Sequence, residues 1–324
     1  MIGKRLNKNI LAPSGALLLP EGTILSSRHL ELLRENGVPP TADDIEDVAP
    51  IGPVLEKAVE EWRHIFRAAR NSDRVFLRSI AEQASVSVRA IAESYDLQTI
   101  LSGLLAHDDY TYRHSVAVSV LSTVIGKWMG YPEDRLRALT VSSLLHDIGK
   151  AKVPPHILAK TGRLTPEEYE IVKKHTTYGY ELILKVNGFS QEHAICALQH
   201  HERMDGTGYP FGLKEETHPF SRIVAVADVF HAMLSKRPYK EPSPFYQVVK
   251  EMHDGAFGRF DPEIVGVFSL RAMEALIGNE VRLSNGQTGR IVRVRRDEVW
   301  KPLVQCGGRF VDLSQVPSLH IERV

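Results

Sequence analysis

Residues 139–150 read LTVSSLLHDIGK, an apolar run that ends on a histidine and an aspartate. Apolar residues at helical spacing predict a helix with one face in a core. An imidazole or a carboxylate in such surroundings costs free energy unless it is paired or bound to a metal. What His146 and Asp147 contact therefore bears on both the fold and the function of the chain.

Four other predicted helical segments carry polar residues in the same way. They place His114 before SVAVSVLSTVIGKWM (115–129), His175 within YEIVKKHTTYGYEL (169–182), His200 and His201 at the end of HAICALQHH (193–201), and Asp228 within RIVAVADVFHAM (222–233). Ten of the 14 histidines lie between His107 and His231. Helical proteins build dinuclear metal sites from imidazoles and carboxylates that several helices deliver to one core.

Each of these features has an ordinary explanation when it is taken alone. A histidine on an apolar helix is usually a hydrogen-bonded core residue, and a His-His pair can stabilise a helix C-terminus. Their joint occurrence favours a metal site. Imidazole with carboxylate suits iron, manganese, nickel or zinc. The two cysteines, Cys196 and Cys306, are too far apart in the sequence to form a structural zinc pattern.

The pattern along the chain predicts three parts. Residues 1–48 combine two apolar runs, broken by Pro-Ser-Gly and Pro-Glu-Gly, with one helix that ends at Gly37, which indicates a small α+β unit. Residues 49–275 are helical in pattern, and residues 276–324 alternate apolar and polar residues around Asn-Gly and Gly-Gly turns, as a small β domain does. We expect the apolar stripe from Val54 to Phe66 to pack on the core, although a second subunit is the alternative.

The composition limits the kinds of partner. The 324 residues are 43% hydrophobic and 25% charged, as in ordinary globular proteins. Lysine plus arginine equals aspartate plus glutamate at 40 each, so no net field recruits a nucleic acid polymer or an anionic membrane. The N-terminal MIGKRLNKNILAPSG lacks the apolar core of a signal peptide, and no uncharged run is long enough for membrane insertion. We expect a cytoplasmic protein with reduced thiols.

Several motifs resemble, in order and spacing, the HD-GYP branch of the HD phosphohydrolase superfamily. They are YRHS (112–115), HDIGK (146–150), KKH (173–175), HHERMDGTGYP (200–210) and RIVAVADVF (222–230). The resemblance covers roughly residues 95 to 270. It implies a mainly α fold with a helical HD-GYP core, between the N-terminal α+β unit and the C-terminal β domain. It also implies a metal-dependent phosphodiesterase that hydrolyses cyclic di-GMP to pGpG, and onward to GMP, with two or three metal ions.

The resemblance also assigns roles to single residues. The implied metal ligands are His114, His146, Asp147, His175, His200, His201 and Asp228. Asp147 would bridge two metals, which lower the pKa of a shared water so that hydroxide attacks phosphorus. Lys150 would join Asp147 in catalysis by approaching the scissile phosphate. The implied substrate contacts are Lys150, Gly208, Tyr209, Pro210, Arg237 and Lys240.

The chain departs from the family pattern at two positions. Three-metal members have a glutamate four residues before the first histidine, where this chain has Tyr110, and the adjacent Asp109 would point about 100° away on a helix. Two metals are therefore expected, with iron or manganese favoured over nickel, zinc or magnesium. The family commonly has an aspartate where this chain has His231. That imidazole can change the hydrogen bonding or metal preference of the site.

Two other functions remain open at this point. The chain can be a non-catalytic receptor or interaction module that retains the fold, or a hydrolase of another nucleotide such as cyclic GMP-AMP. The intact ligand set and Lys150 favour the phosphodiesterase. Either terminal unit can sense a signal or mediate assembly, so a homodimer or a signalling protein partner is compatible with the sequence.

Overall fold

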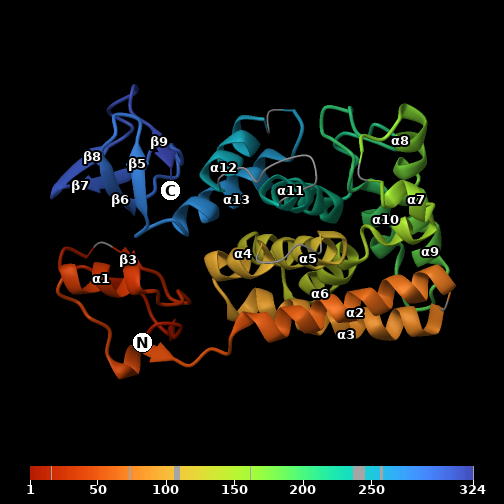
Figure 1. Cartoon of the computed structure of the whole chain (residues 1–324), viewed down its shortest axis with the longest axis horizontal. Helices are drawn as coiled ribbons and strands as arrows, with labels where there is room; N and C mark the ends of the chain where they lie inside the picture. Colours follow the sequence, from red (N-terminus) through yellow and green to blue (C-terminus); the bar gives the residue numbers. More distant parts are fainter. Residues whose placement is uncertain are drawn as a thin grey trace.

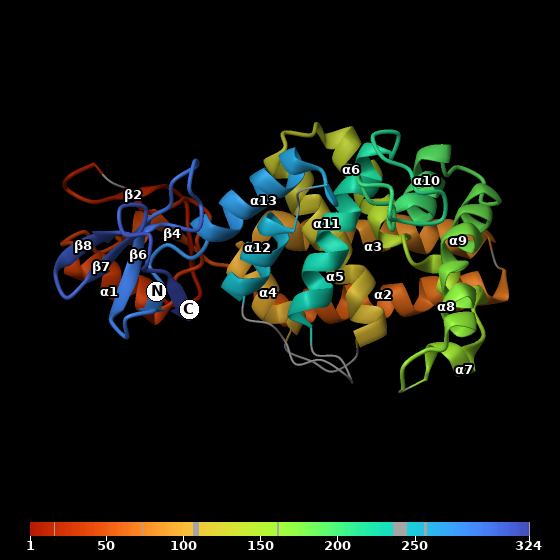
Figure 2. The same ribbon diagram turned by 90° about the horizontal axis from the view of Figure 1, so that it is seen from above.

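The computed structural model describes residues 1–15, 17–72, 74–105, 110–160, 162–235, 245–255 and 258–323. The molecule is elongated, with a helical body at one end and two smaller units side by side at the other (Figures 1 and 2). The smaller units are the two ends of the chain. The prediction of a mainly α fold with a small C-terminal sheet is confirmed.

The N-terminal unit combines two small antiparallel sheets with one helix. Its elements are β1 (Arg5–Leu6), β2 (Ile10–Leu11), β3 (Leu17–Leu19), α1 (Ser27–Glu35), the 3₁₀ helix η1 (Ala42–Asp44) and β4 (Ile45–Glu46), with β1 paired to β4 and β2 to β3. Helix α1 starts where the Ser26 side chain accepts a hydrogen bond from the His29 amide. Leu19, Leu25 and Leu33 are buried in a small core of their own.

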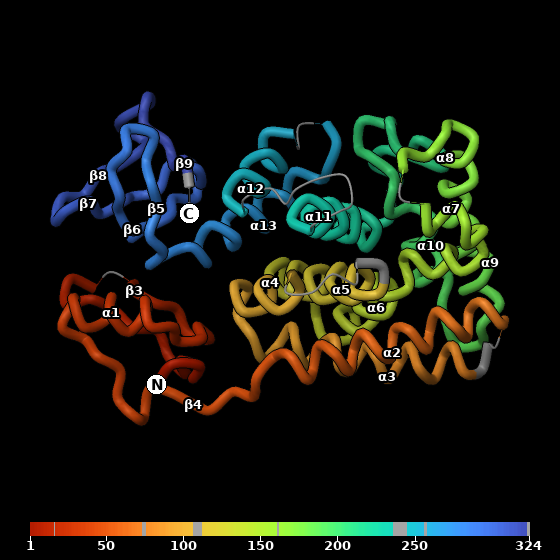
Figure 3. Tube along the Cα trace, in the orientation of Figure 1, coloured from red at the N-terminus to blue at the C-terminus, as the bar shows by residue number. Residues whose placement is uncertain are grey.

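The helical body begins with two long antiparallel helices. In chain order its elements are α2 (Ile51–Asn71), α3 (Arg74–Ser94), α4 (Leu97–Leu105), α5 (Tyr110–Trp128), α6 (Glu133–Leu144), η2 (Ile148–Lys152), α7 (Pro155–Leu158), α8 (Pro166–Lys173), α9 (His175–Leu184), α10 (Gln191–Gln199), α11 (Pro219–Leu234), α12 (Phe245–Asp254) and α13 (Pro262–Glu274). Helices α2 and α3 run side by side along the body (Figure 3). Leu55, Trp62 and Ile65 of α2 are buried against α3 and α5, so the predicted apolar stripe packs on the core.

Helix α5 is the central element of the body. Val116, Val120 and Ala117 face the core shared with α2 and α3, whereas Val118 and Leu121 face the core shared with α11 and α13. A helix that is apolar on both sides is buried rather than amphipathic. Helix α5 therefore connects both layers of the body. None of the helices in the described parts of the chain is both long and apolar enough to cross a lipid bilayer.

The C-terminal unit is one antiparallel sheet. Its strands are β5 (Glu280–Leu283), β6 (Thr288–Arg293), β7 (Leu303–Cys306), β8 (Arg309–Asp312) and β9 (Ile321–Arg323), in the spatial order β8-β7-β6-β5-β9. Its buried Val281 and Ile291 belong to the same apolar cluster as Phe268 of α13. We propose that the divisions after residues 48 and 275 separate structural units of this kind, which pack on one another.

Candidate metal centre

The structure brings the seven predicted metal ligands together in two adjacent groups. One group contains Asp147, His175, His200 and His201, and the other contains His114, His146 and Asp228, with the ligand atoms of each group within 4.8 Å of one another. Six of the seven are buried, and His201 is half-buried. They come from α5, the turn after α6, the start of α9, the end of α10 and the middle of α11. Five segments far apart in the sequence therefore converge on one point.

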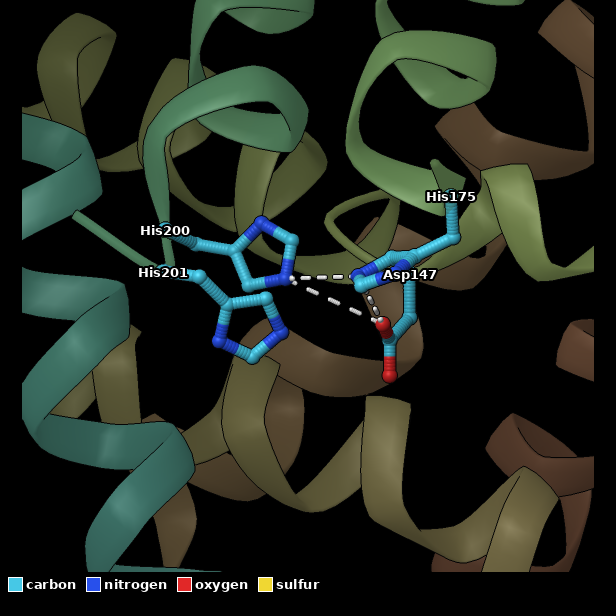
Figure 4. Close-up of side chains that lie close together, drawn as sticks. All are labelled: Asp147, His175, His200 and His201. Atoms are coloured by element: carbon cyan, nitrogen blue, oxygen red, sulfur yellow. Dashed lines mark hydrogen bonds and ion pairs between the residues drawn. The ribbon is translucent and has the colours of Figure 1, made fainter. Parts of the chain in front are cut away.

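Asp147 lies between the two groups. Its Oδ1 is 3.3 Å from Nε2 of His175 and 3.8 Å from Nε2 of His200, as the dashed lines in Figure 4 show for this group. Its Oδ2 is 3.3 Å from Nε2 of His146 and 3.7 Å from Nε2 of His114. Each carboxylate oxygen thus faces a different group of imidazoles. This is the arrangement that a bridging carboxylate requires.

Three of the histidines are oriented by the same local device. Nδ1 of His146 is 2.7 Å from the Ser143 carbonyl, three residues earlier in the chain. His175 and His200 make the matching contacts, with Val172 at 2.7 Å and Ala197 at 2.9 Å. Each acceptor is a carbonyl in the last turn of a helix, where the regular hydrogen bonds of the helix end. The Nδ1–H donates to that carbonyl, which leaves the lone pair of Nε2 directed at the centre.

His114 is held differently, because it lies inside α5. Its Nδ1 is 3.0 Å from Nδ1 of His231, which is buried on α11. Nε2 of His231 is in turn 3.2 Å from Oγ of Ser235. Nε2 of His114 faces Asp228 Oδ1 at 3.1 Å, and if this nitrogen binds a metal, the Nδ1–H of His114 donates and His231 accepts. The residue that departs from the family pattern therefore contacts a predicted ligand directly.

The electrostatics favour ionised carboxylates and, at His175, His200 and His201, neutral imidazoles. Burial lowers the pKa of His175 to about 4 and holds the pKa of His200 and His201 well below the usual range. Burial alone would raise the pKa of Asp147, but Lys150 and His146 outweigh it and hold this pKa well below its ordinary value. The pKa of Asp228 is also well below its ordinary value, because His114 outweighs its burial. The pKa of His146 is raised, because the charge of Asp147 outweighs its burial. Two negative charges with neutral imidazoles beside them suit divalent cations.

Two buried atoms at the centre face only other predicted ligands. Nε2 of His146 and Oδ1 of Asp147 make no hydrogen bond with any described residue. A buried polar group without a partner costs about 1–3 kcal/mol, and a charged one costs more. Bound divalent metals would satisfy both atoms, so the donor set fits the metals that the family resemblance implies. The cluster is therefore suited to hold divalent metal ions.

Lys150 lies directly beside the bridging carboxylate. It belongs to η2, and its Nζ is 2.5 Å from Oδ2 of Asp147. Gly149 allows η2 to pass under α9, because a Cβ there would lie 1.9 Å from the His175 carbonyl oxygen. The HDIGK motif thus combines two predicted ligands, a close backbone approach and a cation at the centre.

The loop after His201 is fixed by the acid that follows the two histidines. The buried carboxylate of Glu202 accepts hydrogen bonds from the amides of Phe211 at 2.8 Å and Leu213 at 2.9 Å. Gly208 lies against the same segment, since a Cβ there would be 2.4 Å from Cα of Glu202. No role for Glu202 was predicted from the sequence. The available signal was an acid directly before a glycine-rich loop, because the backbone amides of such a loop need hydrogen-bond acceptors.

The predicted substrate residues fall into two sets. Tyr209, followed by a cis bond to Pro210, stacks on the ring of His201 with the centroids 4.7 Å apart, so this loop forms one wall of the centre. The other set, Arg237 and Lys240, lies outside the described residues.

The two positions considered for a third metal come before His114 in the sequence. Asp109 lies outside the described residues. Tyr110 is the first residue of α5, at the helix end that also carries His114.

Comparison with known proteins identifies the helical body. The HD domain family model matches residues 99–264, about half of the chain. A cyclic di-GMP phosphodiesterase of Thermotoga maritima is 40% identical over 215 residues, which cover 63% of this chain and 58% of that protein. The cyclic di-GMP phosphodiesterase response regulator RpfG of Xanthomonas campestris is 41% identical over 67% of this chain and 59% of that protein. Each match spans less than two thirds of the relative.

A solved structure has the same fold. The HDG"Y"P protein Bd1817 of Bdellovibrio bacteriovorus aligns with a TM-score of 0.53 and 19% identity, over 82% of this chain and 94% of that one. The matched region of the family model contains every predicted ligand. The chain belongs to the HD domain family, in agreement with the HD-GYP resemblance of its motifs.

Proposed function

We propose that the protein is a metal-dependent phosphodiesterase that hydrolyses cyclic di-GMP to linear pGpG and onward to GMP. The observation that carries this proposal is the position of Asp147, whose two oxygens face two separate groups of imidazoles. A pair of metals about 3.5–4 Å apart is the usual means of cleaving phosphate diesters in line. Relatives that share the motifs bear the name of this activity.

The donor set supports two metal ions, and iron or manganese suits it best. Five imidazoles and two carboxylates match the ligands that these ions prefer, with nickel, zinc and magnesium as less suitable alternatives. When bound, the metals would supply Lewis acidity and a water of lowered pKa. They would also supply the positive charge that a doubly anionic substrate needs in a chain of zero formal net charge.

The protein's own residues would orient the metal ligands and stabilise charge on the substrate. The backbone carbonyls behind His146, His175 and His200 keep each Nε2 directed at the centre, so the ligands need no reorganisation on binding. Lys150 would move its ammonium from Asp147 to a phosphoryl oxygen and stabilise the charge that develops there. Tyr209 keeps the ring of His201 in place.

The other substrate contacts follow from the family resemblance. Gly208, Tyr209 and Pro210 form the wall beside His201, and Arg237 and Lys240 would hold phosphate or guanine groups of the ligand. The expected partner is thus a cyclic dinucleotide rather than a nucleic acid polymer. A cytoplasmic location and association with itself or a signalling protein are compatible with this function.

A turnover assay tests the proposal. Protein purified without air is loaded with ferrous iron or manganese, mixed with cyclic di-GMP, and its products are separated by chromatography. A His146→Ala, Asp147→Ala variant is the control. Metal-dependent formation of pGpG or GMP that is absent in the variant is the expected result. A wild-type protein that holds metal and binds the dinucleotide without cleaving it would be a receptor, and faster cleavage of cyclic GMP-AMP would change the substrate assignment.

A further inference from the structure

We propose that Tyr169, Glu170 and Lys173 of helix α8 form a guanine-binding subsite next to the metal centre. The inference rests on the proposed function, since it assigns a base of the cyclic dinucleotide to a named surface. None of these three residues belongs to the predicted substrate contacts.

The subsite is continuous with the metal centre. The ring of Tyr209 stacks on His201, and Nζ of Lys173 lies 5.6 Å from the centroid of Tyr209. The same Nζ lies 5.4 Å from the centroid of Tyr169. A row of aromatic rings with one cation between them therefore leads from a predicted metal ligand to α8. Helix α8 ends at Lys173, directly before α9, which begins at the predicted ligand His175.

The aromatic groups in this row are available to a ligand. The side chain of Tyr169 is 48% exposed, although it is a large ring on a helix without a single buried residue. Its ring therefore contributes little to the core. Tyr209 is half-buried, with its ring stacked on His201. Exposed aromatic rings beside a cationic groove are the usual platforms for nucleobases.

The charges on α8 match guanine rather than adenine. Lys173 is paired with the carboxylate of Glu170 at 2.7 Å, so a donor and an acceptor stand side by side next to the ring of Tyr169. Guanine presents O6 and N7 as acceptors, which suit Lys173, and its N1–H and amino group are donors, which suit Glu170. Adenine presents a donor where guanine has O6, so its amino group would meet the ammonium of Lys173.

The contact between Tyr169 and Lys173 also has an ordinary explanation within helix α8. Tyr169 and Lys173 are four residues apart on one helix, where a cation and a ring interact without any ligand. That explanation requires no effect on substrates, because the contact would stabilise only α8. The subsite requires an effect that depends on the base of the substrate. The two explanations therefore differ in a measurable way.

The experiment compares a substrate that has guanines with one that has no nucleobase. Metal-loaded full-length protein and its Tyr169→Ala, Tyr169→Phe and Lys173→Met variants are assayed with cyclic di-GMP and with bis(p-nitrophenyl) phosphate. For cyclic di-GMP, Tyr169→Ala should lower kcat/KM about 5- to 150-fold, the range for loss of one base–aromatic stack, and far more than for the nitrophenyl diester. Tyr169→Phe keeps the ring and should keep the rate. Phe310→Ala, at an exposed ring on β8, is the matched control.

Lys173→Met tests the recognition of guanine. Binding of cyclic di-GMP and cyclic di-AMP to the metal-loaded protein is measured by calorimetry, and the variant should lose most of the preference for guanine. Equal losses of kcat/KM for cyclic di-GMP and for the nitrophenyl diester would overturn the subsite. Unchanged kcat/KM in Tyr169→Ala and unchanged guanine preference in Lys173→Met would overturn it as well. If the wild-type protein binds cyclic di-GMP without cleaving it, the same binding comparison still tests the subsite. A protein that cleaves the nitrophenyl diester but neither binds nor cleaves cyclic di-GMP would refute both proposals.

Discussion

Two buried histidines, one in each part of the molecule, separate a structural role from a metal-binding one. His29 lies in α1 of the N-terminal unit, and its Nδ1 accepts from the amide of Ser26 at 3.2 Å and lies 3.1 Å from the carbonyl of Ile24. Among the described residues, no ring nitrogen of His29 is buried without a partner. His146 is also buried, but its Nε2 makes no hydrogen bond with a described residue and faces Asp147 at 3.3 Å. Burial alone therefore does not mark a ligand, whereas an unsatisfied lone pair directed at other ligands does.

Removing the imidazole of His146 or that of His29 should give the largest expected difference in metal content and turnover. His146→Ala removes one donor from the centre, and we expect it to lose one of two bound metals. Turnover should fall by at least about 10²–10³-fold, as it does when a preorganised electrostatic group is removed. His29→Ala should keep both metals and the turnover, and lose about 0.5–2 kcal/mol of stability with its helix cap. Elemental analysis of metal per chain and denaturation by urea measure these effects.

The comparison would fail in either of two ways. A His146→Ala protein that retains two metals per chain would show that this imidazole is a core residue like His29. A His29→Ala protein that loses metal would show that stability of the N-terminal unit controls the centre. The double variant distinguishes the effects, because independent sites should give additive changes.

The sequence allowed prediction of residues that the structure brings together, but not of how they are held. HDIGK and HHERMDGTGYP carry enough identity for His146, Asp147, His200 and His201 to be selected by motif. The division of Asp147 between two groups depends on where α5, α9, α10 and α11 cross, which follows from packing over the whole body. Local patterns do not contain that information, because the contacts join residues far apart in the chain.

Other features were missed for a related reason. The carbonyls of Ser143, Val172 and Ala197 orient the imidazoles, but backbone groups have no signature in the sequence. Glu202 stands beside the two histidines in the sequence. Its role as a hydrogen-bond acceptor depends on a loop that folds back on it from about ten residues further along the chain. Side-chain identity thus predicted the chemistry, and three-dimensional placement determined its geometry.

His231 is an intermediate case and sharpens the comparison. It is buried and satisfied, as His29 is, but its partner is the predicted ligand His114. His231→Leu keeps the bulk and removes the acceptor, so we expect metal affinity to fall about 10–100-fold, the usual loss for a partner of a ligand. His231→Asp should raise the affinity, because a carboxylate accepts the His114 Nδ1–H in a charge-assisted hydrogen bond. Competition with a chelator of known affinity measures both.

The control for His231 is the opposite metal group. Loss of affinity in His231→Leu should affect one metal, because His175 and His200 are oriented by backbone carbonyls that the substitution does not touch. Equal loss of both metals, or a His231→Asp protein as weak as His231→Leu, would mean that the position acts through packing alone.

The smallest expected effect is in the contact between the two terminal units. Arg290 of β6 donates from Nη1 to Glu35 of α1 at 2.8 Å and lies 3.8 Å from Glu31. The carboxylates are largely exposed, so Arg290→Ala should cost less than about 1 kcal/mol of stability and the cost should shrink at high salt. Metal content and turnover should not change, because the pair satisfies its own charges far from the ligands. Urea denaturation at low and high salt measures the cost. A lowered turnover in this variant would show that the terminal units act on the metal centre, and would remove the separation between structural and chemical parts of the molecule.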